Sequence, residues 1–213
     1  MTPEEHNKAI LARYLPPSAI QPVYDFLNTH SVHFHITPQR SSKLGDYRCP
    51  QPRHTYHEIS INGDLAPHLF LLVLLHEMAH LVTFISHGRT VQPHGHEWQQ
   101  HYAALIAQYA AAGHFPPEAQ PLVSRYTRRI PLNRAAGRQL EQLLLQLDRP
   151  QQAARQIHLR DLPVGTTFRL QNRPHSTFRS LELRRTRYRC TELDTGRTYL
   201  ISADAPVQPT QQN

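Results

Sequence analysis

The chain has 213 residues, of which 39% are hydrophobic, and it carries a formal net charge of +7. This length suits one ordinary domain or one domain with a small companion, and the apolar content excludes a wholly disordered chain. Its two cysteines, Cys49 and Cys190, form no Cys-x-x-Cys pair, which excludes a cysteine-built zinc ribbon. Because the N-terminal segment has no apolar signal core, we expect a cytoplasmic protein.

The positive charge is concentrated in the second half of the chain. Residues 1–112 carry seven Lys+Arg and eight Asp+Glu, a net of −1, whereas residues 113–213 carry sixteen arginines and eight acidic residues, a net of +8. The planar guanidinium group of arginine suits phosphates and carboxylates. The second half is therefore expected either to contact nucleic acid or to be a basic surface that only aids solubility.

The first half is predicted to hold four helices and two strands. Apolar periodicity and breaker residues predict helices over residues 4–15, 18–29, 67–86 and 95–112. Alternation of apolar and polar residues predicts strands over 32–38 and 55–61, joined by a polar connection. The third helix is apolar enough to raise the question of a membrane span. Ionisable side chains near its centre would be costly in lipid, so we expect no membrane.

The second half changes character after a proline-rich boundary. A helix is predicted over residues 133–148, with Asn133 as its candidate N-cap, and strand-like segments follow from Leu162 up to a frayed tail that begins at Pro206. The chain is thus divided into a first domain, a basic helical connector and a small arginine-rich β domain, with boundaries at residues 1–116, 117–155 and 156–213.

A run of arginines marks the predicted β domain. Strand alternation along "RSLELRRTRYRC" places Arg185, Arg187 and Arg189 on one face, which we interpret as a row of guanidinium groups along a phosphate backbone. Arg128 and Arg129, in an upstream basic cluster, are further candidates for nucleic-acid contact. The alternative is a solvated strand face whose charges discourage edge pairing.

The apolar helix contains a His-Glu-x-x-His motif at residues 76–80. His76 and His80, four residues apart, lie on one helix face, so both imidazoles can reach one metal ion. Glu77 lies close enough to contact a metal-bound water without binding the metal, as metal-assisted hydrolysis requires. The chain has sixteen histidines, and a random chain of this composition carries such a motif in about 5% of cases, so its context must decide.

A catalytic zinc usually has three protein ligands and one open position. His94 lies in "PHGHEW", after the loop that follows the helix, where the chain can fold back, and Gly95 permits a close turn. Glu97 is the alternative third ligand. The residue that stabilises a transition-state oxyanion stays open among Tyr102, His101 and His96.

The elements "HEMAH" and "PHGHEW", in this order, resemble the SprT-like metalloprotease family, which includes Spartan. "LGDYR" (44–48) and "HEISIN" (57–62) add to the resemblance, which covers about residues 5–112. It implies an α+β fold, with helices around a small antiparallel sheet. It also implies that His76, His80 and His94 bind Zn2+ and that Glu77 is the general base. The strand-rich ending resembles bacterial members of the family that lack a C-terminal zinc ribbon.

The resemblance implies a zinc-dependent endopeptidase that cleaves proteins bound or crosslinked to DNA. The charge of the arginine-rich second half predicts that this half binds the nucleic acid, as single-stranded DNA or DNA junctions. A location in the cytoplasm, in association with the nucleoid, follows from that function. The alternative is a nucleic-acid-binding, transcription-associated accessory protein whose zinc site is not catalytic. A third possibility is a general peptidase acting on soluble peptides, which predicts no stimulation by DNA. The sequence does not indicate the oligomeric state.

Overall fold

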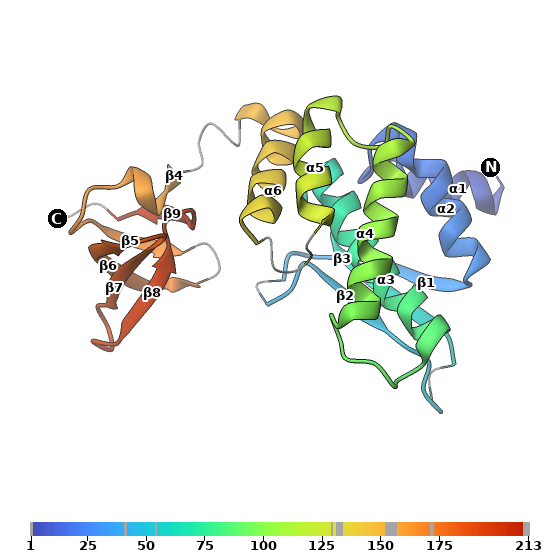
Figure 1. Ribbon diagram of the computed structural model, residues 1–213, viewed down its shortest axis with the longest axis horizontal. Coiled ribbons are helices and arrows are strands. Elements are labelled where there is room, and N and C mark those ends of the chain that lie inside the picture. Colours follow the sequence, from blue (N-terminus) through green and yellow to red (C-terminus); the bar gives the residue numbers. More distant parts are fainter. Residues whose placement is uncertain are drawn as a thin grey trace. The chain divides into compact units, whose positions relative to one another are not determined.

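The computed structural model describes residues 2–40, 42–53, 55–128, 130, 134–151, 157–170 and 173–210. The chain divides into two compact units, Met1–Pro150 and Gln151–Asn213 (Figure 1). Each unit has a hydrophobic core of its own. The first unit combines helices with a small sheet and the second is mainly β, which confirms the predicted mixture of helices and sheets.

Two helices open the first unit. Helix α1 (Pro3–Leu11) begins at Thr2, whose side chain accepts a hydrogen bond from the backbone N–H of Glu5. A 3-10 turn, η1 (Pro17–Ala19), leads into α2 (Ile20–Thr29). The first helix ends four residues earlier than predicted. The chain turns there, and Leu15 enters the core before the two prolines.

The sheet of the first unit has three strands in the order β1-β3-β2. Strand β1 (Val32–Thr37) pairs with β3 (His57–Asn62) in parallel, and β2 (Gly45–Arg48) pairs with β3 in antiparallel fashion. The prediction of a purely antiparallel sheet was therefore wrong. Strand β3 carries Ile59 and Ile61, both fully buried, and it takes the central position between the other two strands.

Strand β2 lies in the segment that was expected to be a polar connection. It is an edge strand, and edge strands are compatible with charged residues such as Asp46 and Arg48. Only Tyr47 offers a large side chain toward α3, where its ring stacks on that of His80. Because polarity dominates this segment, the sequence pattern did not reveal a strand.

Helix α3 (Pro67–His87) is the central element of the first unit. It packs against the sheet and against α4 (His96–Ala111), and ten of its 21 residues are buried, which explains its apolar composition. The same length and composition would allow a membrane span. Helices α5 (Gln120–Thr127) and α6 (Arg134–Asp148) complete the layer of helices (Figure 1).

Helix α6 packs against α3 and is hydrogen-bonded to its beginning. Leu140 and Leu144 of α6 are fully buried in the core of the first unit. Asp148 accepts a hydrogen bond from the backbone N–H of His68 at 2.7 Å, and its other oxygen lies 2.5 Å from His68 Nδ1. Arg149 donates to two backbone carbonyls just before α3, those of Asp64 and Leu65.

The predicted connector, residues 117–155, is thus divided. Its helices α5 and α6 pack within the first unit, while residues 129, 131–133 and 152–156, including the candidate cap Asn133, lie outside the described residues. The predicted helix over 133–148 corresponds to α6. Helix α5 was not predicted, because its segment contains only one fully buried position, Val123.

The second unit is a six-stranded sheet in the order β4-β9-β5-β6-β7-β8, and each of its described strand pairs is antiparallel. Its strands are β4 (Ile157–His158), β5 (Thr167–Leu170), β6 (Arg173–Arg184), β7 (Arg187–Glu192), β8 (Thr198–Ser202) and β9 (Pro206–Pro209), and the 3-10 turn η3 (Leu159–Asp161) follows β4. The core contains Phe168, Phe178 and Cys190. The predicted frayed tail was wrong for its first residues, since β9 buries Val207 between β4 and β5.

Candidate metal centre

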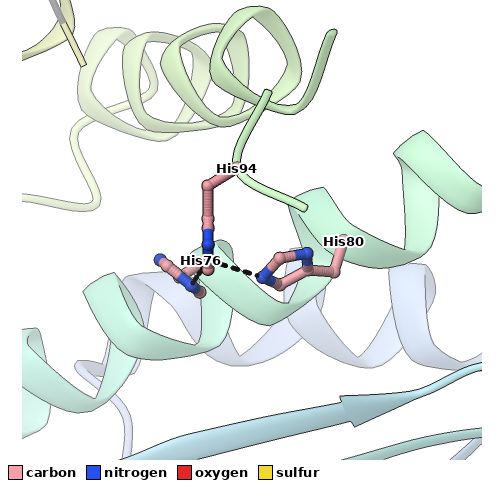
Figure 2. Close-up of side chains that lie close together, drawn as sticks. All are labelled: His76, His80 and His94. Atoms are coloured by element: carbon pink, nitrogen blue, oxygen red, sulfur yellow. Dashed lines mark hydrogen bonds between the residues drawn. The ribbon is translucent and has the colours of Figure 1, made fainter. Parts of the chain in front are cut away.

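Three histidines converge above helix α3 (Figure 2). His76 and His80 project from one face of the helix, one turn apart, and His94 reaches them from the loop that precedes α4. The Nε2 atom of His94 lies 3.1 Å from Nε2 of His76 and 3.1 Å from Nε2 of His80. The structure therefore brings together the three histidines that the sequence predicted as ligands.

The position of His94 depends on a sharp backbone turn. His94 has a positive φ of 59°, and its carbonyl accepts a hydrogen bond from the Gln99 side chain at 2.9 Å. A Cβ at Gly95 would lie only 2.8 Å from the carbonyl oxygen of Gln92. Only glycine fits this point of the turn, so Gly95 allows the chain to direct His94 back over α3.

The donor set fits a tetrahedral metal ion. All three imidazole nitrogens lie within 4.8 Å of one another. Zinc binds imidazole nitrogens at about 2.1 Å, which places neighbouring nitrogens roughly 3.4 Å apart, close to the 3.1 Å observed here. Burial lowers the pKa of His76 to about 3 and that of His80 to about 4, and it also lowers the pKa of His94. The three rings are therefore neutral at pH 7, and each has a nitrogen lone pair available for a metal ion.

Glu97, the alternative third ligand, does not belong to this cluster in the part of the chain that the structure describes. It follows the turn by two residues and points back toward the backbone of Gly95. The turn at residue 94 therefore places His94, and not Glu97, beside His76 and His80.

Trp98 packs against all three histidines. Its ring lies 4.6 Å from that of His76, 5.2 Å from that of His80 and 4.5 Å from that of His94, measured between centroids. The side chain is only 2% exposed, and none of the described residues accepts a hydrogen bond from its Nε1. Trp98 therefore forms an apolar surface against the three histidines and restricts the orientations of their imidazoles.

Glu77 lies beside the histidine cluster and is buried, with 6% of its surface exposed. Burial raises the pKa of its carboxyl to about 7, and the charge of Asp46 adds to this rise. Nearby cations and a backbone hydrogen bond from Tyr47 act in the opposite direction. A carboxyl group with a pKa near neutrality can both accept and release a proton at pH 7, as a general base requires.

Strand β2 fixes the position of Glu77. A Cβ at Gly45 would lie 2.5 Å from Glu77 Oε1 and 2.9 Å from its Cγ, so the carboxylate occupies space that any other residue would fill. Farther along β2, the hydroxyl of Tyr47 lies 2.9 Å from Nδ1 of His57. Gly45 and Tyr47 were not predicted as site residues. The only signal for them was the resemblance of "LGDYR" to the family pattern.

Among the candidates for oxyanion stabilisation, only Tyr102 borders the site. Its ring centroid lies 5.2 Å from that of His76, and the side chain is buried. His101 faces His87 instead, with ring centroids 5.9 Å apart. His96 is the exposed first residue of α4. The rings of Tyr102 and Tyr126 are in contact, with centroids 6.2 Å apart, which links α4 to α5 next to the site.

Two pockets flank the histidine cluster. One, of about 400 Å³, is lined by His76 and Glu77 together with residues of α4, α5 and α6. The other, of about 290 Å³, is lined by His80, Trp98 and residues of the loop before His94. An extended chain that passed over the histidines would therefore meet a hollow on either side of the metal position.

The predicted row of arginines is interrupted by a turn. Arg185 lies between β6 and β7 with a positive φ of 53°, so it belongs to a two-residue turn and not to a strand face. Arg187 and Arg189 do share one face of β7, opposite the buried Tyr188 and Cys190, as predicted. The prediction failed at Arg185 because residues 184–187 contain no glycine, proline, asparagine or aspartate to mark the turn.

The sheet register adds arginines to this face. Arg169 of β5 pairs with Thr177, and Arg179 of β6 pairs with both Thr167 and Thr191, all on the side away from the core residues Phe168 and Phe178. We call Arg169, Arg179, Arg187 and Arg189 the arginine face. Arg189 contacts Glu182 at 3.5 Å, whereas within the described residues no ion pair involves the other three.

The two upstream arginines differ from this group. Arg128 is exposed just after α5, in the first unit, and its Nε donates to the carbonyl of Ser124 at 3.1 Å. Arg129 lies outside the described residues. The arginine face belongs to the second unit, so it is a separate surface in the sequence and in the fold.

The first unit thus combines a mixed sheet, a central helix and a cluster of three histidines next to a buried glutamate, which is the arrangement of a zincin-type metallopeptidase site. The model of the SprT-like family matches residues 20–121, and this part of the chain belongs to that family. The SprT-like family is generally one of zinc metallopeptidases. No curated protein and no solved structure compared with the chain matches it significantly.

Proposed function

We propose that the protein is a zinc-dependent endopeptidase of the SprT type that cleaves proteins bound or crosslinked to DNA. The observation that carries the proposal is the convergence of His76, His80 and His94 beside the buried carboxyl of Glu77. A site that only stabilised the fold would need no acidic side chain held at the edge of the ligand cluster.

The chemistry divides among the residues of this site. His76, His80 and His94 would hold the metal, and zinc bound there would supply a Lewis acid that lowers the pKa of water to about 7. Glu77 takes the proton of the attacking water and returns it to the leaving amine. Gly45 and Tyr47 of β2 keep the Glu77 carboxyl in place. Trp98 keeps the three imidazoles oriented.

Recruitment to DNA is proposed to come from the second unit. Residues 151–213 contain ten arginines and five acidic residues, a net of +5, whereas residues 1–150 contain thirteen Lys+Arg and eleven Asp+Glu, a net of +2. The arginine face gathers four of the ten on one side of the sheet. An open row of guanidinium groups suits the regularly spaced phosphates of a nucleic acid.

Cleavage of a DNA-binding protein tests this function. The wild type and Glu77→Gln are each incubated with such a protein, with and without single-stranded DNA, and the products are followed by gel and mass spectrometry. We expect cleavage by the wild type alone, stimulated by DNA. Cleavage that DNA does not stimulate would support a general peptidase and contradict the proposed recruitment by DNA.

The alternative function, a nucleic-acid-binding accessory protein with a metal site that is not catalytic, is supported by the arginine face alone. It predicts DNA binding without cleavage by wild type under any condition. The same experiment separates the two, because the alternative requires no difference between the wild type and Glu77→Gln.

A further inference from the structure

The pocket on the Glu77 side of the histidine cluster has walls from five elements. Its apolar part comes from α3, with Leu69, Leu72 and Val73. Its volume of about 400 Å³ lies in the lower part of the range of roughly 300–1,000 Å³ typical of ligand pockets, so it has room for one long side chain. Because His76 and Glu77 line one end, a group held here lies next to the reacting bond.

The far wall is formed by helices that follow the segment matching the SprT-like family. Tyr126 of α5 and Glu141 of α6 line the pocket, whereas the family match ends at residue 121. A Cβ at Gly137 would lie 3.0 Å from the Tyr126 ring, so α6 approaches α5 closely at this point. Glu141 follows Gly137 by one helical turn and therefore projects from the same side of α6, toward the pocket.

The charges in the pocket favour a cationic guest. Three charged side chains line it: Glu77, Glu141 and Lys43. Lys43 forms an ion pair with Asp46 at 2.8 Å, which offsets its charge. Glu141 is exposed as a whole residue, but its carboxyl end lines the pocket, where burial raises its pKa and the charge of Arg138 on the same helix acts in the opposite direction.

We propose that this pocket holds the side chain next to the scissile bond and that Glu141 gives it a preference for lysine or arginine. These side chains combine an apolar stem, which suits the leucine and valine wall, with a cationic end that reaches the carboxylate. Glu141 is thus a specificity-determining residue contributed by α6. The inference rests on the proposed peptidase function, since it assigns a substrate to that same site.

The test begins with the cleavage sites that the wild type produces in an unfolded protein, identified by mass spectrometry. Lysine and arginine are expected to be enriched at one of the two positions that flank the cleaved bond. Two peptides that differ only by lysine or norleucine at that position are then compared. We expect a ratio of kcat/KM of about fivefold in favour of lysine, the value of a partly exposed ion pair.

Substitutions at residue 141 then assign the preference. Glu141→Gln is expected to bring the ratio close to one, and Glu141→Lys to reverse it in favour of a glutamate-containing peptide. The control is Glu118→Gln, which makes the same charge change at an exposed position of η2 outside the pocket and keeps the fivefold ratio. A preference that survives Glu141→Gln, or a wild-type preference for acidic residues, would overturn the inference.

A binding measurement separates this inference from the peptidase function. Fluorescence anisotropy of the two labelled peptides is measured on the metal-loaded Glu77→Gln protein, with and without Glu141→Gln. A lysine preference that depends on Glu141 supports the pocket assignment even if the wild type cuts nothing, a result that would contradict the proposed function alone. Cleavage without any basic preference contradicts the pocket assignment and leaves the function standing.

Discussion

The carboxylate of Glu77 fills the space that a side chain at residue 45 would need. A Cβ at Gly45 would lie 2.5 Å from Glu77 Oε1, 2.9 Å from Cγ and 3.0 Å from Cδ. Glycine at this point of β2 is therefore a condition for the observed position of the Glu77 carboxylate, the proposed general base. The contact joins an edge strand to the helix that carries His76 and His80.

Gly45→Ala is expected to displace the Glu77 carboxylate without disturbing the histidines. A displacement of about 1 Å in a catalytic group costs on the order of 100-fold in rate, so kcat/KM should fall by about that factor. Zinc content, measured by atomic emission, should remain at the wild-type level because no ligand is touched. Full activity in Gly45→Ala would mean that Glu77 does not act from its observed position.

We expect metal binding to require His94 but not Glu97. His94→Ala removes one of three converging nitrogens. Loss of a residue that only supports a metal ligand weakens metal binding roughly 10–100-fold, so His94→Ala should weaken zinc binding by more than this. Glu97→Ala is the matched control three positions away, and it should keep the wild-type affinity in a competition with a fluorescent chelator. Equal losses in the two variants would remove His94 from the ligand set.

Trp98→Ala is expected to destabilise the metal-free protein and to loosen the metal centre. Removing a buried tryptophan leaves a cavity that costs about 3–5 kcal/mol, which urea unfolding of the chelator-treated protein can measure. Trp98→Phe keeps an aromatic ring against the imidazoles and should lose less than half of that amount. A zinc affinity unchanged in Trp98→Ala would show that the ring does not orient the ligands.

Helix α6 is expected to be necessary for a stable first unit. A fragment of residues 1–150 should unfold cooperatively on heating, because it retains the buried Leu140 and Leu144 and the contact of Asp148 with His68. A fragment of residues 1–116 exposes the surface that these leucines cover and should unfold at a lower temperature or without a cooperative transition. Equal melting temperatures, followed by circular dichroism, would contradict this account.

The arginine face is expected to contact phosphates. The double variant Arg179→Gln/Arg187→Gln should lower the affinity for single-stranded DNA and reduce the slope of log affinity against log salt by about 1.4, the value for two phosphate contacts. Arg197→Gln, which changes an exposed arginine in the turn between β7 and β8, is the control and should leave the slope nearly unchanged. An unaltered slope in the double variant would exclude this face as the binding surface.

The part of the site that could be predicted from the sequence is the part set by local geometry. His76, Glu77 and His80 belong to one helix, so their spacing alone places them together. His94 is separated from them by a loop, and its prediction needed the family resemblance. Gly45 and Glu141 act through contacts between distant segments, and no local pattern marks such contacts.

The fold shows the same division between local and distant effects. The four helices and two strands predicted for the first unit are present. Strand β2 has no fully buried side chain and the short helix α5 has only one, Val123, and neither was predicted. The parallel pairing of β1 with β3 joins segments that are distant in the sequence, so no local pattern marks it.

The most direct test of the central claim is the rate of peptide-bond cleavage by Glu77→Gln relative to the wild type, in preparations whose zinc content is measured on the same samples. Glu77 is not a ligand, so we expect about one zinc per chain in both proteins and cleavage of an unfolded protein by the wild type only. Equal cleavage rates at equal zinc content would contradict the role of Glu77. An absence of cleavage by a fully zinc-loaded wild type would contradict the peptidase itself.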